Sequence, residues 1–374
     1  MYSLICLAPC FSSGRSEEDM EMFDTTIVEN GDYDWAMAVF TKAIDIGLND
    51  HSIYRDRGLL YYHKGDYDRA ITDFNEALRL KPDYAPAYSD RGNAYGKKGD
   101  YDRSITDYNE AIRLEPGDAS TYYNRGITYE KKGDHDRAIA DFSEAIRLKP
   151  DYASAYHNRG FIYDKKGDYD RAIEDYNETI RLKPDDALKY YNRGYTYGKK
   201  GDHDRAIADF SEAIRIKPDD DFIYWNRGIS YYHKGDYDRA IADYDEAIRL
   251  KPDHASVYYF RGYSYRKKGD HDQAITDFSE AIRLEPDYAS AYYDRGLAYG
   301  YKGDYDRAIA DYDEAIRLKP EHVLAYFNRG ITYENKGDIA RAISDWEVVL
   351  LIKPANANDR ELVEKARQNL ERVK

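Results

Sequence analysis

Residues 119–152 read ASTYYNRGITYEKKGDHDRAIADFSEAIRLKPDY, and the same 34-letter pattern returns along most of the chain. The glycine of its central KGD string recurs every 34 residues without insertion or deletion. These glycines are Gly65, Gly99, Gly133, Gly167, Gly201, Gly235, Gly269 and Gly303, with Gly337 in a diverged copy. The prolines keep the same spacing from Pro82 to Pro354. Self-similarity at this period is typical of a repeat protein and overrides the two or three globular domains that length alone would predict.

Each repeat carries two hydrophobic patterns. Its apolar positions are 4, 8 and 11, followed by 17, 20, 21, 24, 27 and 28, counted from the first residue of the repeat. Both sets advance by three and four residues, which predicts two amphipathic helices and no strand. In residues 119–152 the first helix is expected to end at Gly133 in the left-handed conformation. Asp134 is placed to cap the second helix, and Pro150 prevents that helix from continuing.

This pattern resembles the tetratricopeptide repeat, a helix–turn–helix unit of 34 residues. The residues that carry the resemblance in the quoted repeat are Tyr122, Gly126, Tyr129, Ala138, Phe142, Ala145 and Pro150. Nine repeats are predicted, at 51–84, 85–118, 119–152, 153–186, 187–220, 221–254, 255–288, 289–322 and 323–356. The resemblance implies an all-α, right-handed superhelical solenoid of about ten units. It also implies that the first helices line a concave groove and the second helices cover the convex side.

The two ends of the array are expected to differ from its middle, because terminal repeats must present a polar face to water. Residues 17–50 are interpreted as a degenerate N-terminal capping repeat, and residues 357–374 as a C-terminal solvating helix. Residues 1–16 have a short apolar run with no positive charge before it. This favours a disordered leader or a misassigned start over a vestigial export or lipidation signal.

Composition excludes several classes of protein. A net charge of −15 argues against binding to nucleic acid, which requires clustered lysine and arginine. No stretch approaches the roughly 18 apolar residues that an integral membrane span needs. The two cysteines, Cys6 and Cys10, lie too close to the N-terminus to form a disulfide framework. The predicted location is the cytoplasm, or the cell envelope if residues 1–16 direct export.

Two charged positions recur in all nine full repeats, arginine at position 7 and aspartate at position 23. Both border the apolar stripes, which predicts a ladder of bidentate Arg–Asp pairs within a repeat or with the preceding one. The alternative is that the arginines extend to water and the aspartates bind water or the arginine at position 19 of the same helix. The predicted rungs include Arg125, Asp141, Arg159, Asp175, Arg193, Asp209, Arg227 and Asp243.

The main functional hypothesis is a partner-binding groove along the first helices. Aromatic residues at positions 5 and 9, flanked by lysines at position 13, suit an extended or helical peptide, including one that carries acidic groups. The predicted contacts are Tyr123, His157, Phe161, Tyr191, Tyr195, Trp225, Tyr259, Tyr263, Tyr293 and Phe327, with Lys131, Lys165 and Lys199 beside them. Trp225 and Tyr259 are the first choices, because tryptophan and tyrosine dominate binding hot spots. The competing interpretation is that the position-5 aromatics only pack against the neighbouring first helix and the lysines only compensate helix ends.

One known function of the family is testable residue by residue. Clamps for chaperone C-terminal carboxylates use Lys at position 5 and Asn at 9, Asn at 6 of the next repeat, and Lys at 2 and Arg at 6 of the third. Asn93 and Asn124 match this pattern, but Ser89 replaces the first lysine, and Ser154 and Asn158 occupy the last two places. No three consecutive repeats supply the set, so a chaperone-type carboxylate clamp is not predicted.

The sequence predicts no catalytic residue, cofactor or metal site. None of the nine histidines forms an H-x-x-x-H motif, and the GDxD strings lack the spacing of a calcium loop. The predicted function is therefore a non-catalytic scaffold that binds a peptide or protein partner in the groove. The alternatives are a structural protein that self-associates end to end, and an envelope accessory protein if residues 1–16 direct export.

Overall fold

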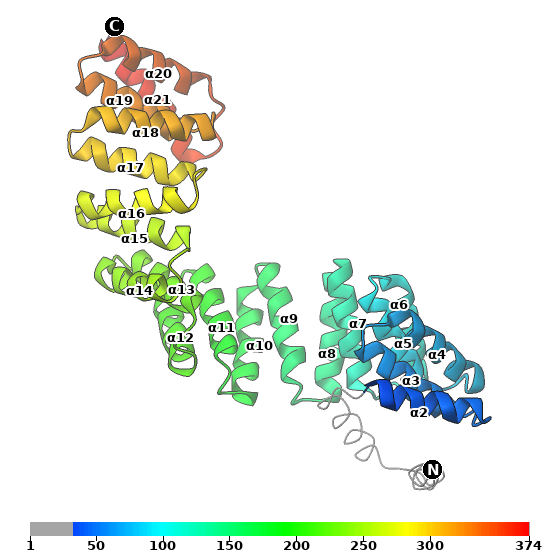
Figure 1. Cartoon of the computed structure of the whole chain (residues 1–374). Helices are drawn as coiled ribbons and strands as arrows, with labels where there is room; N and C mark the ends of the chain where they lie inside the picture. The colour runs from blue at the N-terminus through cyan, green and yellow to red at the C-terminus, as the bar shows by residue number, and fades with distance from the viewer. Residues whose placement is uncertain (1–32, 374) are drawn as a thin grey trace. The chain divides into compact units, whose positions relative to one another are not determined.

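The computed structural model describes residues 33–373, which form 20 α-helices and no strand (Figure 1). The all-α fold predicted from the hydrophobic period is confirmed for this part of the chain. The interpretations of residues 1–16 and of the first helix of the 17–50 repeat lie outside the described residues. The chain divides into two compact units, Met1–Asp168 and Tyr169–Lys374, called here the N-terminal unit and the C-terminal unit.

The helices follow one another in pairs. In the N-terminal unit they are α2 (Tyr33–Asp45), α3 (His51–His63), α4 (Tyr67–Leu80), α5 (Ala85–Lys97), α6 (Tyr101–Leu114), α7 (Ala119–Lys132), α8 (His135–Leu148) and α9 (Ala153–Lys165). In the C-terminal unit they are α10 (Tyr169–Leu182), α11 (Ala187–Lys200), α12 (His203–Ile216), α13 (Asp221–His233), α14 (Tyr237–Leu250), α15 (Ala255–Lys268), α16 (His271–Leu284), α17 (Ala289–Tyr301), α18 (Tyr305–Leu318), α19 (Val323–Asn335), α20 (Ile339–Leu351) and α21 (Ala357–Val373). From α3 to α20, odd numbers mark the first helices of the repeats and even numbers mark the second helices.

The turn between the two helices of a repeat is formed by the KGD string. Gly133 has a φ of +84°, a left-handed conformation that a residue without a side chain adopts at little cost. The amide of the next residue, Asp134, donates to the carbonyl of Tyr129 at 2.8 Å. The Asp134 side chain in turn accepts from the amide of Arg137 at 3.2 Å and caps α8. The structure therefore has both the glycine stop and the aspartate cap that the sequence predicts for this turn.

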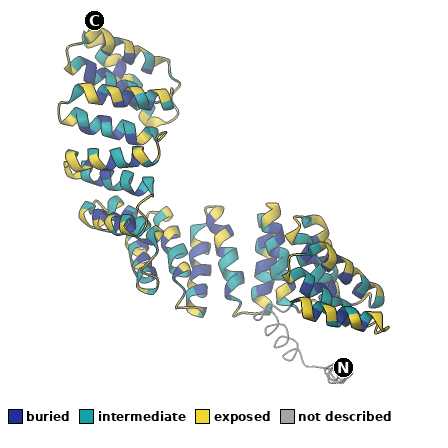
Figure 2. Ribbon diagram, in the orientation of Figure 1, coloured by how far each residue is buried: buried dark blue, intermediate teal, exposed yellow. Residues whose placement is uncertain are grey.

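Small side chains allow the two helices of a repeat to approach closely. Ala138 and Ala145 of α8 have no exposed surface, and the ring of Phe142 is also fully buried. A Cβ atom at Gly126 of α7 would lie only 2.8 Å from that ring. Figure 2 shows that buried positions occur on every described helix and are not gathered in one centre. Each repeat thus buries its apolar side against its neighbours, as expected of a repeat array.

Helix α21 covers the C-terminal end of the array. Its buried residues Leu362, Ala366 and Leu370 lie on one stripe and pack against α19 and α20. An ion pair of 2.6 Å between Arg372 Nη1 and Glu334 Oε1 adds a contact at the surface. The C-terminal capping helix predicted from the sequence is therefore present.

The first helices of successive repeats approach one another more closely than the second helices do. Backbone contacts join α3 to α5, α5 to α7 and α7 to α9 in the N-terminal unit, and α11, α13, α15, α17 and α19 in sequence in the C-terminal unit. No comparable contact joins successive second helices within residues 33–373. The row of first helices is therefore the inner side of each compact unit, which is where the groove was predicted.

Candidate partner-binding surface

A bidentate ion pair, called a rung here, joins the two helices of a repeat. In the repeat of α13 and α14, Nε and Nη2 of Arg227 donate to Oδ2 and Oδ1 of Asp243 at 2.9 and 2.7 Å. The same geometry occurs in Arg57–Asp73, Arg91–Asp107, Arg125–Asp141, Arg193–Asp209, Arg261–Asp277, Arg295–Asp311 and Arg329–Asp345. Of the remaining predicted pair, Arg159 belongs to the N-terminal unit and Asp175 to the C-terminal unit.

Each rung arginine also contacts the preceding repeat. Nη1 of Arg227 donates to Oγ of Ser211 on α12 at 3.0 Å. The two kinds of bond that the sequence left as alternatives, within a repeat and to the repeat before it, thus occur together. The arginine at position 19 has a different partner, because Nε of Arg239 donates to the helix-capping Asp236 at 2.6 Å. The rungs are therefore structural bonds between three helices.

Burial shifts the pKa of Asp243, the carboxyl group of the rung in this repeat. The side chains of Asp243 and Arg227 are 7% and 20% exposed. Burial raises the pKa of Asp243, and the hydrogen bonds and the charge of Arg227 lower it by a smaller amount. Burial therefore disfavours the ionised carboxylate more than the interaction with Arg227 favours it, as is common for buried ion pairs. Such a pair holds the repeat together and is not accessible to a partner.

A second set of bonds joins consecutive first helices, from position 5 of one repeat to position 6 of the next. The hydroxyl of Tyr293 accepts from Nδ2 of Asn328, and the hydroxyl of Tyr259 donates to Oδ2 of Asp294, both at 2.8 Å. The further pairs are Tyr123–Asn158, Tyr191–Asn226 and the ion pair Arg55–Asp90. The side chain of Trp225 contains no hydrogen-bond acceptor, and it faces the ring of Phe260 with the ring centres 6.1 Å apart. Position 5 is thus chemically matched to position 6 of the following repeat.

These bonds determine where the predicted position-5 contacts lie. Tyr123, His157, Tyr191, Trp225, Tyr259 and Tyr293 are all half-buried. Phe327 is only 7% exposed and belongs to the core of the last repeat, packed with Val323 and Trp346. The prediction that Phe327 contacts a partner is therefore corrected, because α20 and α21 enclose the core around it. The position-5 tyrosines thus bond to the next first helix and also pack against a ring of their own second helix, as Tyr293 does against Tyr312.

Tyr293→Phe is expected to lower the free energy of unfolding by about 0.5–1.5 kcal/mol, because it removes the hydroxyl that Asn328 binds. Tyr195→Phe is the matched control, since the Tyr195 side chain is 43% exposed. Its effect is expected to stay within about 0.5 kcal/mol. Urea denaturation followed by circular dichroism measures both variants. Equal losses would show that the Tyr293 hydroxyl contributes nothing across the repeat boundary.

The exposed apolar side chains of the inner side come from positions 2, 9 and 13. Leu188 and Tyr195 on α11 are 51% and 43% exposed, and Phe222 on α13 is 42% exposed. Tyr301 on α17 is exposed as well, as is Phe161 in the N-terminal unit. The sequence prediction included Phe161 and Tyr195 but missed the other three. Leu188 and Phe222 were detectable as large residues at position 2, where most repeats carry serine or another small residue.

Lysines at position 13 lie over the aromatic rings at position 9 of the same helices. The pairs, with distances from Nζ to the ring centre, are Lys165–Phe161 at 4.4 Å, Lys199–Tyr195 at 5.1 Å and Lys267–Tyr263 at 5.7 Å. Distances of this size permit a cation–π attraction. Lys131 is exposed too but follows an isoleucine at position 9. The predicted arrangement of aromatic residues flanked by lysines is thus found at position 9 and not at position 5.

Arg266 on α15 is a singular feature of the inner side, since other repeats have glycine, tyrosine or an acidic residue at this position. Its Nη2 lies 3.2 Å from Oδ1 of Asp294, and its guanidinium lies 4.6 Å from the centre of the Tyr263 ring. The buried Nε has no hydrogen-bond partner among the described residues. Burial raises the pKa of Asp294, and the positive charge of Arg266 opposes that shift. The arginine therefore keeps donor capacity that the fold does not use.

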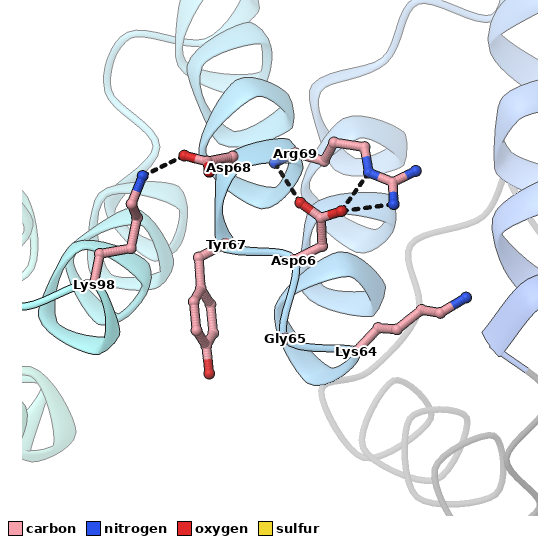
Figure 3. Close-up of a pocket in the computed structure, with 7 residues that line it drawn as sticks. All are labelled: Lys64, Gly65, Asp66, Tyr67, Asp68, Arg69 and Lys98. Carbon is pink, nitrogen blue, oxygen red and sulfur yellow. Dashed lines mark hydrogen bonds and ion pairs between the residues drawn. The ribbon is translucent and has the colours of Figure 1, made fainter.

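Clefts at the helix turns are a separate feature. Figure 3 shows one of them, lined by Lys64, Gly65, Asp66, Tyr67, Asp68, Arg69 and Lys98. Within it Lys98 binds Asp68 of the preceding repeat, and Arg69 binds the helix-capping Asp66 at 2.6 Å. The bond between successive repeats recurs in Lys64–Asp34, Lys132–Asp102, Lys166–Asp136, Lys200–Asp170, Lys234–Asp204, Lys268–Asp238, Lys302–Asp272 and Lys336–Asp306. The charged groups of these clefts bind one another and join repeats.

Neither a metal centre nor a membrane-spanning helix is found in residues 33–373. No three or more histidine, cysteine, aspartate or glutamate side chains are grouped there so as to hold a metal ion. No helix of that range combines the length and the apolar character needed to cross a membrane.

Fold and surface together define a helical-hairpin repeat protein. Family models described as TPR repeat match residues 58–99, 162–201, 230–269 and 262–303. Models described as tetratricopeptide repeat match residues 89–153, 293–358, 187–220 and 142–174. The chain therefore belongs to the tetratricopeptide repeat family, and none of the matching models is that of an enzyme.

Several solved structures have a similar arrangement of helices. YrrB, described as a TPR protein with an unusual peptide-binding site, is 23% identical over 49% of this chain and 95% of its own, with a TM-score of 0.45. MamA protein is 27% identical over 45% of this chain and 92% of its own, with a TM-score of 0.43. Yeast Tom70 is 17% identical over 93% of this chain and 94% of its own, with a TM-score of 0.46. Comparison with curated proteins gives no match.

Proposed function

We propose that the chain is a non-catalytic scaffold that binds a peptide or protein partner on the inner side formed by its first helices. One observation carries this proposal, namely the exposed apolar side chains of Leu188, Tyr195 and Phe222 on two adjacent first helices. Grouped exposed apolar and aromatic residues mark interaction surfaces. The second helices α4 to α18 present charged pairs instead, such as Glu246–Arg249 with its shortest bond at 2.6 Å. In the last repeat, α20 also exposes Ile339, Leu350 and Leu351.

The polar groups support a binding role over a catalytic one. The recurrent arginines, aspartates and lysines of the repeat are bonded to one another in rungs, helix caps and bonds between repeats. Groups held this way maintain the spacing of the helices. A row of equally spaced helices suits a partner that runs across it and contacts each helix in turn. The part of the repeat that varies most along the row is the inner surface, where a specific partner would be recognised.

Site-specific photo-crosslinking tests the proposal. Tyr195→p-benzoylphenylalanine and Phe222→p-benzoylphenylalanine place a photoreactive group on the inner side in the cell that naturally makes the chain. Arg215→p-benzoylphenylalanine on α12 is the matched control, because Arg215 is 63% exposed on a second helix. We expect a discrete crosslinked partner from the two inner positions and none from the control. Equal crosslinking at all three positions, or none at the inner two, would contradict the proposal.

A further inference from the structure

On four first helices of the C-terminal unit, α11, α13, α15 and α17, the inner side has the opposite charge to the chain as a whole. The fifth, α19, carries Glu334, which binds Arg372 of α21. The chain has a net charge of −15. On α11, α13, α15 and α17, positions 2, 5, 6, 9, 12 and 13 include Lys199, Arg266 and Lys267 but only one acidic residue, Asp294. The side chains of Asp294 and Arg266 are only 5% and 12% exposed, whereas both lysines are exposed. The charge that this side presents to water is therefore positive.

Exposed apolar groups accompany these cations. Lys199 lies over the ring of Tyr195. Leu188 is about two turns closer to the start of the same helix. Phe222 is exposed on the adjacent helix α13, which packs against both α11 and α15. The surface thus carries apolar groups at the starts of α11 and α13 and aromatic and cationic groups near the ends of α11 and α15. We call the set Leu188, Tyr195, Lys199, Phe222, Tyr263, Arg266 and Lys267 the aromatic–cationic surface.

We propose that the aromatic–cationic surface binds an acidic segment of a partner protein that also carries apolar side chains. The carboxylates of that segment bind Lys199, Arg266 and Lys267, and its apolar side chains cover Leu188, Tyr195 and Phe222. This inference rests on the proposed function and specifies the chemistry of the partner. Charge complementarity of this kind also accelerates association and disfavours partners of the wrong charge.

Arg266 is the residue best suited to recognise a carboxylate. A guanidinium binds a carboxylate most strongly through two parallel hydrogen bonds. In this structure Arg266 has one contact of 3.2 Å to Asp294, and Asp294 shares its other oxygen with the hydroxyl of Tyr259. The Tyr263 ring, 4.6 Å away, keeps the guanidinium on the inner side. The Arg266 side chain is 12% exposed and its Nε is buried, so a partner carboxylate adds its bond at the exposed edge of the guanidinium.

The same observations disfavour other occupants. Phosphate-backbone binding depends on many neutralised phosphates, and three cationic side chains in a strongly acidic chain are too few. A basic segment would face the positive charges of Lys199, Arg266 and Lys267, beside which Asp294 is only 5% exposed. A purely polar acidic segment would leave Leu188 and Phe222 in water. An acidic segment with apolar residues satisfies both kinds of group.

Fluorescence anisotropy with the full chain tests the inference. The probe is a fluorescein-labelled peptide of three Glu-Leu-Asp-Phe units with acetylated and amidated ends, so a terminal carboxylate takes no part. Control peptides replace the acidic residues by lysine or the apolar residues by serine. We expect the acidic–apolar probe to bind at least about tenfold more tightly than either control and to weaken between about 50 and about 300 mM NaCl. Failure of that probe to bind, or equal binding of the lysine probe, overturns the inference.

Matched variants locate the binding. Lys199→Gln/Lys267→Gln is expected to weaken binding of the acidic–apolar probe about tenfold. Lys200→Gln/Lys268→Gln removes the same charge from the next residue of each helix, where the lysines bind Asp170 and Asp238, and is expected to change binding less than about twofold. Leu188→Ser/Phe222→Ser is expected to weaken binding by a similar factor to the first pair. Equal effects of the two lysine pairs overturn the inference.

Two further outcomes separate this inference from the proposed function. Self-association of the chain in analytical ultracentrifugation that is abolished by Lys199→Gln/Lys267→Gln would assign the surface to a second copy and overturn the inference. A partner that crosslinks at Tyr195 and Phe222 equally in the wild type and in the Lys199→Gln/Lys267→Gln variant would support the proposed function. That result would overturn the inference that the partner segment is acidic. Loss of that crosslink in the Lys199→Gln/Lys267→Gln variant, with retention in the Lys200→Gln/Lys268→Gln variant, supports both.

Discussion

Asp243→Ala is expected to lower the free energy of unfolding by about 3–5 kcal/mol, the range observed when one partner of a buried ion pair is removed. The substitution leaves the guanidinium of Arg227, 20% exposed, without the carboxylate that binds two of its nitrogens. Only the bond of 3.0 Å to Ser211 would remain. A buried cation with unused donors is costly, because burial removes the water that would otherwise bind them.

Glu246→Ala on the same helix is the control for this prediction. Glu246 forms an ion pair with Arg249 three residues later, and these side chains are 34% and 63% exposed, far more than the 7% and 20% of the rung. Pairs of this kind contribute little, so the loss is expected to be far smaller than for Asp243→Ala. Urea unfolding gives the free energies, and hydrogen exchange shows whether the loss is concentrated in α13 and α14, since repeat arrays open in parts. Similar losses in the two variants would show that the rung contributes no more than a surface pair.

The reverse substitution, Arg227→Met, adds a pH dependence with a definite sign. Burial raises the pKa of Asp243 above its ordinary value of 3.8, and Arg227 opposes that shift. The substitution removes this opposing charge, so the pKa of Asp243 rises further. A carboxyl group whose pKa is raised by folding favours the folded state below the unfolded pKa and loses that contribution as pH rises through the folded pKa. The destabilisation by Arg227→Met is therefore expected to shrink as the pH is lowered from 7 toward about 4. Melting temperatures of the variant and the wild type across this range measure the effect.

Gly228→Ala is expected to destabilise the chain by about 1–3 kcal/mol, because a single methyl group would overpack the junction of α13 and α14. A Cβ atom at Gly228 would lie 2.6 Å from Cε1 of Tyr244. The Tyr244 side chain is fully buried, so its ring has no open space to move into. The helix can relieve the clash only by moving away from its partner.

Gly198→Ala on α11 makes the same chemical change in a different environment. No atom lies within 4 Å of a Cβ placed at Gly198, which is inside a helix. Alanine favours a helix over glycine by up to about 1 kcal/mol, so this variant is expected to be more stable than the wild type. Thermal and urea unfolding compare the two variants. If both variants were more stable than the wild type, packing at Gly228 would not limit the size of the residue at that position.

Local features of the sequence predicted the repeat well. The hydrophobic period defined both helices, and the Gly133 stop and the Asp134 cap were read from their order alone. This was possible because helix formation and capping depend on residues within one or two turns of each other. The sequence also predicted that Arg227 binds within its own repeat or to the preceding one, where Asp243 and Ser211 are its partners. A charged residue beside an apolar stripe needs such a partner.

Contacts between repeats were harder to predict. The hydroxyls of Tyr259 and Tyr293 looked suited to a ligand, yet they bind Asp294 and Asn328 of the next repeat. The sequence did contain a signal for these bonds, because a tyrosine at position 5 is followed 35 residues later by asparagine or aspartate. Trp225 is instead followed at that spacing by Phe260, whose ring it faces. It could be recognised only by comparing position 5 with position 6 of the following repeat and not with its own helix.

The amino-acid order by itself determined that this chain is a tandem array of helical hairpins with charged pairs in each, because every repeat carries its own helix signals. Only the tertiary structure decided which aromatic residues meet water. The packing of consecutive repeats leaves most position-5 residues half-buried and Leu188, Tyr195 and Phe222 exposed. That packing involves whole side chains across the repeat boundary, which no single repeat encodes.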